Sequence, residues 1–321
     1  MTSDRPSSKD LGQHADALIL PGLDGTNPLG FLAALGLLAL VNDSKSAARP
    51  RMGWTTTGGT WVPFVLWSSG SKLGEGELLS ALTDRLATTI SDHPCSVLRQ
   101  LSAVAEDTAQ RRQLFERVAN SGDLAAMEWL AALASDMADP GLINQLQTTR
   151  RDYFYRNLDS VIGRTKIEHL RRAIFRPWDY ADALDNQSLH LDPSEDRRHA
   201  YQWNKPAADP NRALRGGMLG ANRLALEAIS LFSSFPEGNT LRTVGFTGTR
   251  STNTRWTWPI WTPGLSLQVV RSLIAAEVFQ KESFDSSDIA ALRTQGVVAV
   301  YRTNRILVEK TPNFTPARRM A

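Results

Sequence analysis

The sequence predicts an α+β protein that is rich in helices, with short antiparallel sheets or hairpins near the N-terminus and in the C-terminal third. Apolar residues recur at helical spacing through most of residues 77–175. Strand-like stretches flank Gly58-Gly59, and others follow residue 240. With 321 residues, 42% of them hydrophobic, the chain is long enough to bury a core without disulfides.

Composition divides the chain into three expected regions. Residues 1–15 are polar and Ser-rich, which predicts a disordered tail. Residues 16–149 predict an N-terminal α/β and helical region, and residues 150–321 predict a basic C-terminal α+β region. The two larger regions could also form one continuous domain.

The first expected elements are a strand, a buried helix and a hairpin. Residues 17–20 are a short apolar run, and turn-forming residues follow it up to position 28. Asn27 is expected to cap a helix over 29–42 that is apolar nearly all round and therefore buried. Gly58-Gly59 predicts a hairpin over 52–67, whose second strand Pro63 should confine to an edge or a bulge.

The middle of the chain predicts helices. The expected ranges, from apolar spacing and end signals, are 77–90, 96–105, 109–119, 124–138 and 152–175. The segment 177–215 is long, polar and weakly periodic, and such segments tend to be functional or disordered.

The last third predicts alternating helices and strands. Helices are expected over 218–232, 266–279 and 288–294, and strands over 241–247 and 255–261. We further expect a final hairpin of 297–301 and 306–309, which turns at Thr303-Asn304, and a loose tail over 312–321.

Charge is distributed unevenly along the chain. Residues 1–149 carry 11 Lys and Arg against 16 Asp and Glu, a net charge of −5, whereas residues 150–321 carry 25 against 17, a net charge of +8. Such an asymmetry favours a polyanionic partner for the second half. A scattered, solvated surface is the equally simple alternative.

Several functional classes find no support in the sequence. The single cysteine, Cys95, allows no internal disulfide, and the longest apolar run, 31–41, is too short for a membrane span of about 20 residues. The histidines lack metal-ligand spacing, and neither a nucleophile elbow nor a complete phosphate-binding loop is present. We therefore expect a cytoplasmic protein without membrane contact, metal, cofactor or catalytic residues.

Two stretches have the composition of nucleic-acid-binding loops. The segment 201–223 interleaves aromatic, amide and cationic side chains, which bind bases by stacking and phosphates by charge. Its candidate contact residues are Trp203, Lys205, Arg212, Arg215, Asn222 and Arg223. The alternative is that Trp203 packs in the core and the charges are solvated.

The second stretch is the basic tip 247–255, which contains no acidic residue and could enter a DNA groove. Its candidates are Thr249, Arg250, Asn253 and Arg255. The alternative is an ordinary surface hairpin followed by core tryptophans, at least one of Trp256 and Trp258 being buried. Asn27 is a further candidate, because helix N-termini attract phosphate.

Three passages carry a resemblance to a known family. They are LPGLDGTNPLGFLAALG over 20–36, MLGANRLA over 218–225 and WPIWTPGLSL over 258–267. They resemble the type I-G (formerly I-U) CRISPR-associated proteins, in particular the group related to the large subunit of the Cascade effector complex.

The resemblance implies a subunit that binds crRNA and target double-stranded DNA near the protospacer-adjacent motif, beside backbone and crRNA-end subunits, and that helps recruit the helicase-nuclease. Because 321 residues is short for a large subunit, an accessory protein of the same complex is also open. Two alternatives remain: a structural adaptor without nucleic-acid contact, and a metal-dependent nuclease whose site the sequence does not disclose.

Overall fold

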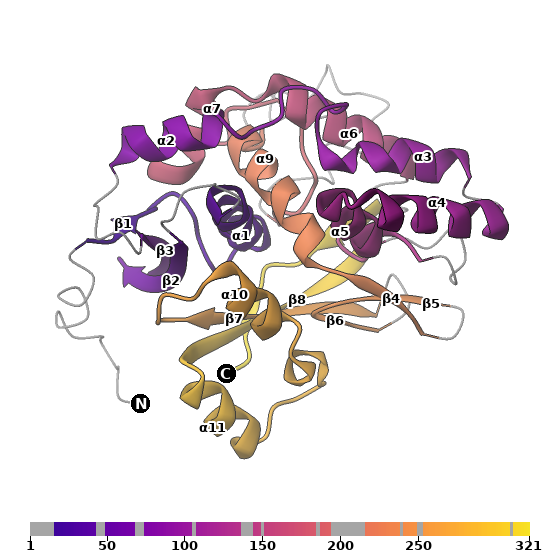
Figure 1. Ribbon diagram of the computed structural model, residues 1–321. Coiled ribbons are helices and arrows are strands. Elements are labelled where there is room, and N and C mark those ends of the chain that lie inside the picture. Colours follow the sequence, from indigo (N-terminus) through magenta and orange to yellow (C-terminus); the bar gives the residue numbers. More distant parts are fainter. Residues whose placement is uncertain are drawn as a thin grey trace.

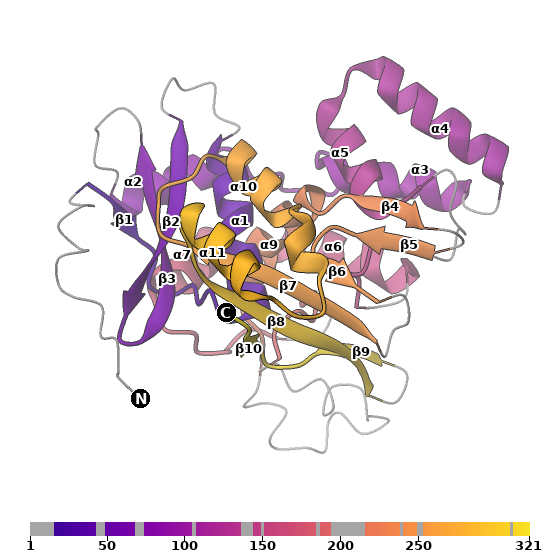
Figure 2. The same cartoon turned by 90° about the horizontal axis from the view of Figure 1, so that it is seen from below.

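The computed structural model has the predicted α+β class, with helices stacked above two antiparallel sheets (Figures 1 and 2). The expected tail 1–15 lies outside the described residues, as does most of the long polar segment. The structure describes residues 16–42, 49–67, 74–104, 107–135, 144–148, 151–183, 187–193, 216–237, 240–248, 253–308 and 311–321.

The N-terminal sheet has the strand order β1-β3-β2, with β1 at Leu18–Ile19, β2 at Pro50–Thr57 and β3 at Thr60–Trp67. Gly58 and Gly59 have φ values of 59° and 86°, as the mirror-image hairpin turn requires. The expectation that Pro63 lies on an edge strand or a bulge is wrong, because β3 is central. Only its carbonyl is used on the β1 side, where it accepts from the Leu20 N–H.

Helix α1, Pro28–Asn42, lies at the centre of the molecule and is buried along nearly its whole length. The predicted cap is confirmed: Asn27 Oδ1 accepts from the Leu29 N–H at 2.8 Å. Helix α9, Leu219–Ala228, packs directly against α1 (Figure 1). The contact is so close that a Cβ at Gly36 would overlap the carbonyl oxygen of Leu224.

A layer of helices covers α1 and α9 on the side away from the C-terminal sheet (Figures 1 and 2). Its helices are α2 (Glu75–Thr83), α3 (Val97–Ala103), α6 (Arg151–Arg164) and α7 (Ile167–Phe175), and α4 (Thr108–Ser121) and α5 (Leu124–Leu133) lie to one side. The helix expected over 152–175 is interrupted at residues 165–166, and the one expected over 77–90 ends at Thr83.

The C-terminal sheet has the order β10-β8-β7-β6, and β9 pairs with the far end of β8. Its strands are β6 (Phe246–Thr247), β7 (Thr254–Trp261), β8 (Val297–Val308), β9 (Thr311–Phe314) and β10 (Arg318–Arg319). A separate ribbon of β4 (Ser234–Glu237) and β5 (Thr240–Thr243) precedes it.

Two expectations for the C-terminus are wrong. Thr303 and Asn304 form no turn, because β8 is one strand of 12 residues in which they pair with Trp256 and Arg255. The tail is not loose either, since it forms β9 and β10 and the Val300 N–H donates to the Ala321 carbonyl. The polar pair Thr303-Asn304 predicted a turn, but in the structure each of the two pairs with a residue of β7.

Aromatic side chains join the two sheets to α1. Phe31 lies at 5.7 Å from the rings of both Trp54 and Trp258, measured between centroids. Trp256 and Trp258 are fully buried, which confirms the core alternative for both. The Trp258 Nε1 donates to the Gly25 carbonyl at 2.9 Å, so one indole fixes the turn before α1 on strand β7.

The remaining helices, α10 (Leu267–Ile274) and α11 (Ser286–Thr294), pack against β7 and β8 beside the C-terminal sheet. Arg302 attaches the segment between them, because its guanidinium donates to the carbonyls of Lys281 and Glu282. Residues from Leu20 to Phe314 contribute to one continuous core. The acidic part of the chain, 1–149, and the basic part, 150–321, therefore both contribute to this core.

The α1–α9 contact gives a stability prediction. Gly36→Ala places a methyl group against the Leu224 carbonyl and is expected to destabilise the fold by about 1–3 kcal/mol or more. Gly76→Ala, at an open position of α2, is the matched control and should stabilise by up to about 1 kcal/mol. Urea unfolding followed by circular dichroism measures both; equal effects of the two variants would contradict the close contact.

Candidate functional site

Six of the residues that the sequence predicts to bind nucleic acid lie outside the described residues. They belong to the segments 201–223 and 247–255 of the sequence: Trp203, Lys205, Arg212, Arg215, Thr249 and Arg250. The other five are Asn27, Asn222, Arg223, Asn253 and Arg255, and the structure places each of them.

The N-terminus of α1 is already occupied by groups of the chain. Asn27 Oδ1 accepts from the first helical N–H groups, and the Thr26 N–H donates to Asp24 at 2.7 Å. The Asn27 amide donates at 2.9 Å to Asp192, a buried carboxylate that also accepts from the Tyr180 hydroxyl. The predicted phosphate contact at Asn27 is therefore not supported, because the anion beside this helix end is a side chain of the protein.

Asn222 and Arg223 are fully buried on α9, so neither lies on the surface as a phosphate contact would require. Asn222 accepts from the Leu189 N–H at 2.7 Å and donates to the Met218 carbonyl. Arg223 forms an ion pair with Glu227, one helical turn further along. Residues four apart share a helix face, so the pair follows from the geometry of α9.

The Arg223–Glu227 pair belongs to a buried network. His93 Nδ1 accepts from the Cys95 N–H at 3.0 Å, which leaves Nε2 to donate to the Glu227 carboxylate at 3.1 Å. Burial opposes ionisation of Glu227, but the charge of Arg223 and the hydrogen bonds from His93 and Arg223 outweigh it and lower the Glu227 pKa to about 2. Burial also raises the pKa of the Cys95 thiol. The network is structural in character.

The tip of the β6–β7 hairpin is only partly described. Asn253 is exposed, as the prediction requires. Arg255 is partly buried and forms an ion pair with Glu282 at 2.6 Å. This hydrogen bond and charge lower the pKa of the Glu282 carboxyl. Arg255 is therefore neutralised within the protein, whereas Asn253 keeps its predicted place at the surface.

Many cations of the basic half have internal partners. The described ion pairs of this half include Arg171–Glu75, Arg172–Asp179, Arg172–Asp182, Arg242–Glu237, Arg271–Glu128 and Lys281–Asp288. Arg302 and Arg305 instead donate to backbone carbonyls in the interior. Burial lowers the pKa of both groups, that of Arg305 to about 10. The excess positive charge of this half therefore does not appear at the surface in proportion to composition.

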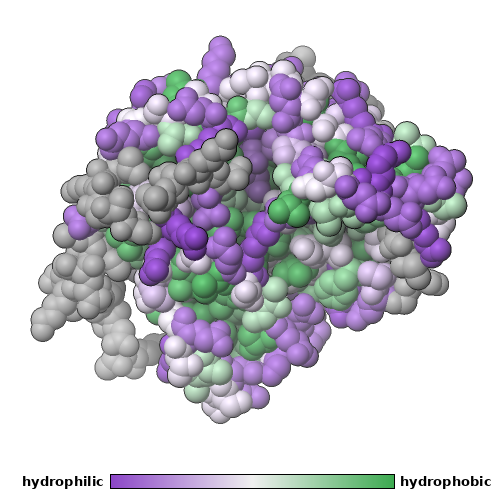
Figure 3. All heavy atoms as spheres, in the orientation of Figure 1, coloured by the Kyte–Doolittle hydropathy of each residue, from purple (hydrophilic) through white to green (hydrophobic). Residues whose placement is uncertain are grey.

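Three exposed cations on α6, at the α6–α7 junction and after α7 form no ion pair within the described part of the chain. They are Arg156, Lys166 and Arg176. Tyr153, whose ring is 48% exposed, precedes Arg156 by three positions and so shares its helix face. Figure 3 shows hydrophilic residues along the upper side of the molecule, where these helices lie. We call Tyr153, Arg156, Lys166 and Arg176 the α6–α7 surface.

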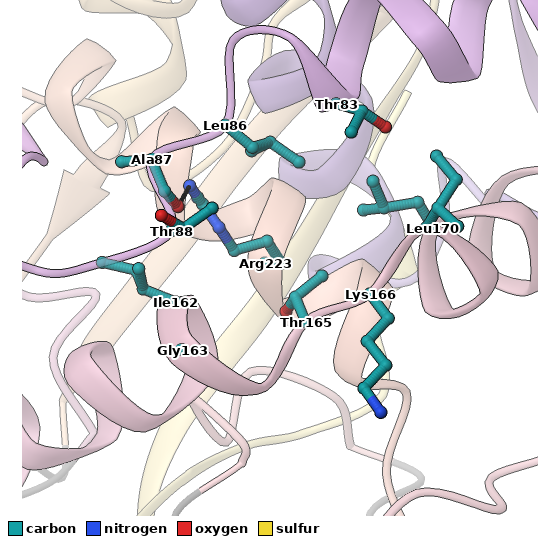
Figure 4. A pocket seen from close by; sticks show the side chains of 11 residues that line it. Thr83, Leu86, Ala87, Thr88, Ile162, Gly163, Thr165, Lys166, Leu170 and Arg223 are labelled. Atoms are coloured by element: carbon teal, nitrogen blue, oxygen red, sulfur yellow. Dashed lines mark hydrogen bonds between the residues drawn. The ribbon is translucent and has the colours of Figure 1, made fainter.

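A pocket of about 140 Å³ opens beside the α6–α7 surface (Figure 4). Its walls come from the end of α2, the turn after it, the α6–α7 junction and α9. The lining residues are Thr83, Leu86, Ala87, Thr88, Ile162, Gly163, Thr165, Lys166, Ile167, Leu170 and Arg223. Sequence reasoning missed this site, because its residues come from four separate elements; the interruption at 165–166 was the one local feature that could have indicated it.

Two other features that indicate function are metal-binding clusters and membrane-spanning helices. Within the described ranges, no group of three or more His, Cys, Asp or Glu residues is arranged to hold a metal ion. No helix in the same ranges combines the length and the apolar character that crossing a membrane requires. Comparison with models of known protein families and with curated proteins finds no match to the chain. A functional argument therefore depends on the chemistry of the residues.

The buried network predicts a pH dependence of stability. The unfolded chain binds the Glu227 proton near pH 4.5 and the folded chain near pH 2, so the carboxylate stabilises the fold above pH 4.5 and this contribution is lost as the pH falls toward 2. Glu227→Gln should cost about 3 kcal/mol at pH 7, and the deficit should shrink below pH 4.5.

Urea unfolding at pH values from 7 to 2.5 measures this effect. Glu128→Gln is the matched control, because it breaks the half-exposed pair with Arg271 and should cost less than about 1 kcal/mol. A Glu227→Gln deficit that is the same at pH 7 and pH 3 would show that the carboxylate is not held ionised.

Proposed function

We propose that the chain is a nucleic-acid-binding subunit of a type I CRISPR RNA-guided complex, which contacts target DNA near the protospacer-adjacent motif and helps recruit the helicase-nuclease. The observation that carries the proposal is the assembly of the three resembling passages into one structural unit. Helix α1 packs on α9 at Gly36, and the turn before α1 accepts a hydrogen bond from Trp258 of β7, although α1 ends at residue 42 and α9 and β7 lie beyond residue 218.

The contacts within this unit involve the residues that make the passages resemble the family. The Gly25 carbonyl accepts from the Trp258 indole, and a Cβ at Gly36 would overlap the Leu224 carbonyl. All three passages contribute to the same hydrophobic core. Their convergence favours a shared fold with the resembling group, and the proposed role follows from that resemblance.

The α6–α7 surface supports nucleic-acid binding independently of the resemblance. Arg156, Lys166 and Arg176 are exposed and form no ion pair within the described residues, and Tyr153 is 48% exposed. Cations on phosphates and aromatic rings on bases are the common elements of single-strand binding. We assign to this surface the opened target strand or the guide.

Reading of the short DNA motif is assigned to the hairpin tip. Arg250 and Asn253 have the side chains that bind guanine and adenine edges in the major groove. The loop residues Trp203, Lys205, Arg212 and Arg215 stay in the proposal as backbone contacts, as does Thr249 at the tip. We propose a non-catalytic role and a cytoplasmic location, where the crRNA-guided complex meets its target.

A second candidate, a structural adaptor, is favoured by exposed apolar side chains on α5 and α10. Leu124 is 70% exposed, and Met127 and Val269 are exposed as well. Glu128 and Arg271 link the two helices by an ion pair, so the apolar residues lie on neighbouring elements. An adaptor would bind protein subunits here and would leave no footprint on DNA or RNA.

The triple variant Arg156→Ala, Lys166→Ala, Arg176→Ala tests the nucleic-acid interface. It is expected to weaken DNA binding, and to reduce the slope of log K against log salt by about 0.7–0.9 for each phosphate that the protein no longer neutralises. The control is Arg51→Ala, Arg293→Ala, Arg318→Ala, which changes net charge equally on other parts of the surface. Fluorescence anisotropy at several salt concentrations measures both.

The outcome separates the two candidate functions. Unchanged DNA affinity in the triple variant, together with loss of subunit association in Leu124→Asp, would favour the adaptor. Co-purification of the wild-type chain with crRNA and backbone subunits, followed by RNA sequencing, tests the complex itself.

Motif reading has a separate test. Arg250→Ala and Asn253→Ala should each reduce the preference for duplexes that carry the correct motif by about 1–3 kcal/mol, with little change in salt dependence. Competition binding between duplexes with and without the motif measures the preference. An unchanged preference in both variants would remove the hairpin tip from the proposal while leaving the α6–α7 surface in it.

A further inference from the structure

We propose that the pocket at the α6–α7 junction receives one pyrimidine base, unstacked from a single nucleic-acid strand that runs along the α6–α7 surface. The proposal deepens the nucleic-acid binding proposed above and depends on it. It assigns a ligand class to a site that comes from the end of α2, the turn after it, α6, α7 and α9.

The size of the pocket selects the ligand. An apolar cavity of about 150 Å³ accepts a single benzene ring. The pocket measures about 140 Å³, so it fits one six-membered ring and is small for a free metabolite of ordinary size. One base of a polymer, whose remaining contacts lie outside the pocket, is the ligand that this volume suits.

The lining suits a flat ring with a polar edge. Leu86, Ile162 and Leu170 supply apolar wall, and Thr88 and Thr165 place hydroxyl groups at the pocket. The Thr165 hydroxyl donates to the Val161 carbonyl at 2.6 Å, so its oxygen can still accept. Bases taken out of the stack are held in this way, between apolar side chains and with hydrogen bonds to their edges.

Charge distinguishes a base from a phosphate. The one buried cation in the lining, Arg223, is already neutralised by Glu227, so the bottom of the pocket favours a neutral group. The Lys166 ammonium points out of the pocket, as Figure 4 shows. A strand that places a base inside would therefore bring its backbone phosphate toward Lys166.

The neighbouring surface continues the strand path. Arg156 and Gly163 are seven residues apart on α6, about 10 Å along one helix face, and Tyr153 lies one turn before Arg156. Phosphate contacts at Arg156 and Lys166 would thus flank the entrance on both sides. The half-exposed Tyr153 ring offers a stacking surface for an adjacent base.

Gly163 provides the entrance. A Cβ at this position would meet no atom within 4 Å, so the backbone faces open space beside the pocket. Gly163 lines the pocket, and a larger side chain here can reach across its mouth without a clash at Cβ, in a helix where most residues are preferred to glycine. Gly163→Leu is therefore a variant that should block the site and keep the fold.

The experiment compares full-length wild type, Gly163→Leu and Gly76→Leu, since Gly76 is an equally open helical glycine away from the pocket. Binding of an oligothymidylate, an oligoadenylate and an abasic oligonucleotide of equal length is measured by anisotropy at two salt concentrations. Wild type and Gly76→Leu should prefer the thymidylate over the abasic strand by about tenfold. In Gly163→Leu this preference should be lost, with affinity for the abasic strand unchanged.

Photocrosslinking of wild type with an oligonucleotide that carries 5-iodouracil gives a second readout that needs no variant. Crosslinked peptides from residues 83–88 or 162–170 support the proposal, and crosslinks confined to other regions overturn it. This readout decides the matter if Gly163→Leu fails to fold.

The remaining outcomes are distinct. Salt-dependent binding of all three oligonucleotides with equal affinity overturns the pocket and leaves the proposed function standing, whereas no binding of any oligonucleotide overturns both. Equal preference for adenylate and thymidylate overturns the selection of a single ring. Loss of association with another subunit in Gly163→Leu, with base preference intact, identifies a protein side chain as the occupant and also overturns the proposal.

Discussion

The approach of α1 to α9 is the constraint on which the rest of the structure depends. Backbone meets backbone at Gly36 and again where Gly220 meets the chain at His169, so no side chain can be inserted at either place. The two buried helices form a central layer, and other elements pack on both of its sides. The aromatic residues of the sheets pack on one side and the α2–α7 layer on the other, which places Arg223 at the bottom of the α6–α7 pocket.

Features determined by neighbours in the sequence were predictable, and features determined by distant partners were not. The Asn27 cap, the Gly58-Gly59 turn and the burial of residues 29–42 follow from local chemistry, and all three are confirmed. The position of Pro63 and the continuity of β8 depend on which strands lie beside them, which no local pattern discloses. The class of the fold was therefore accessible, but the order of its strands was not.

The contrast between local and distant contacts also explains why the candidate site residues were only partly predictable. Side-chain type suggested that Asn222 and Arg223 face solvent, yet both have buried partners that come from packing. Net charge was misleading for a related reason, because composition counts a neutralised Arg172 in the same way as an exposed Arg176. The α6–α7 surface depends on which cations have ion-pair partners, and the pocket is formed by four separate elements, so no local pattern discloses either of them.

Because Cys95 is buried beside the His93–Glu227 network, its thiol can report on local opening of the native structure. Its raised pKa and its completely covered side chain suppress the thiolate that alkylating reagents need. Modification in the native state must therefore await a transient separation of the turn 93–96 from α5 and α9. The rate of labelling with iodoacetamide then measures the free energy of that opening at a single position, without any engineered probe.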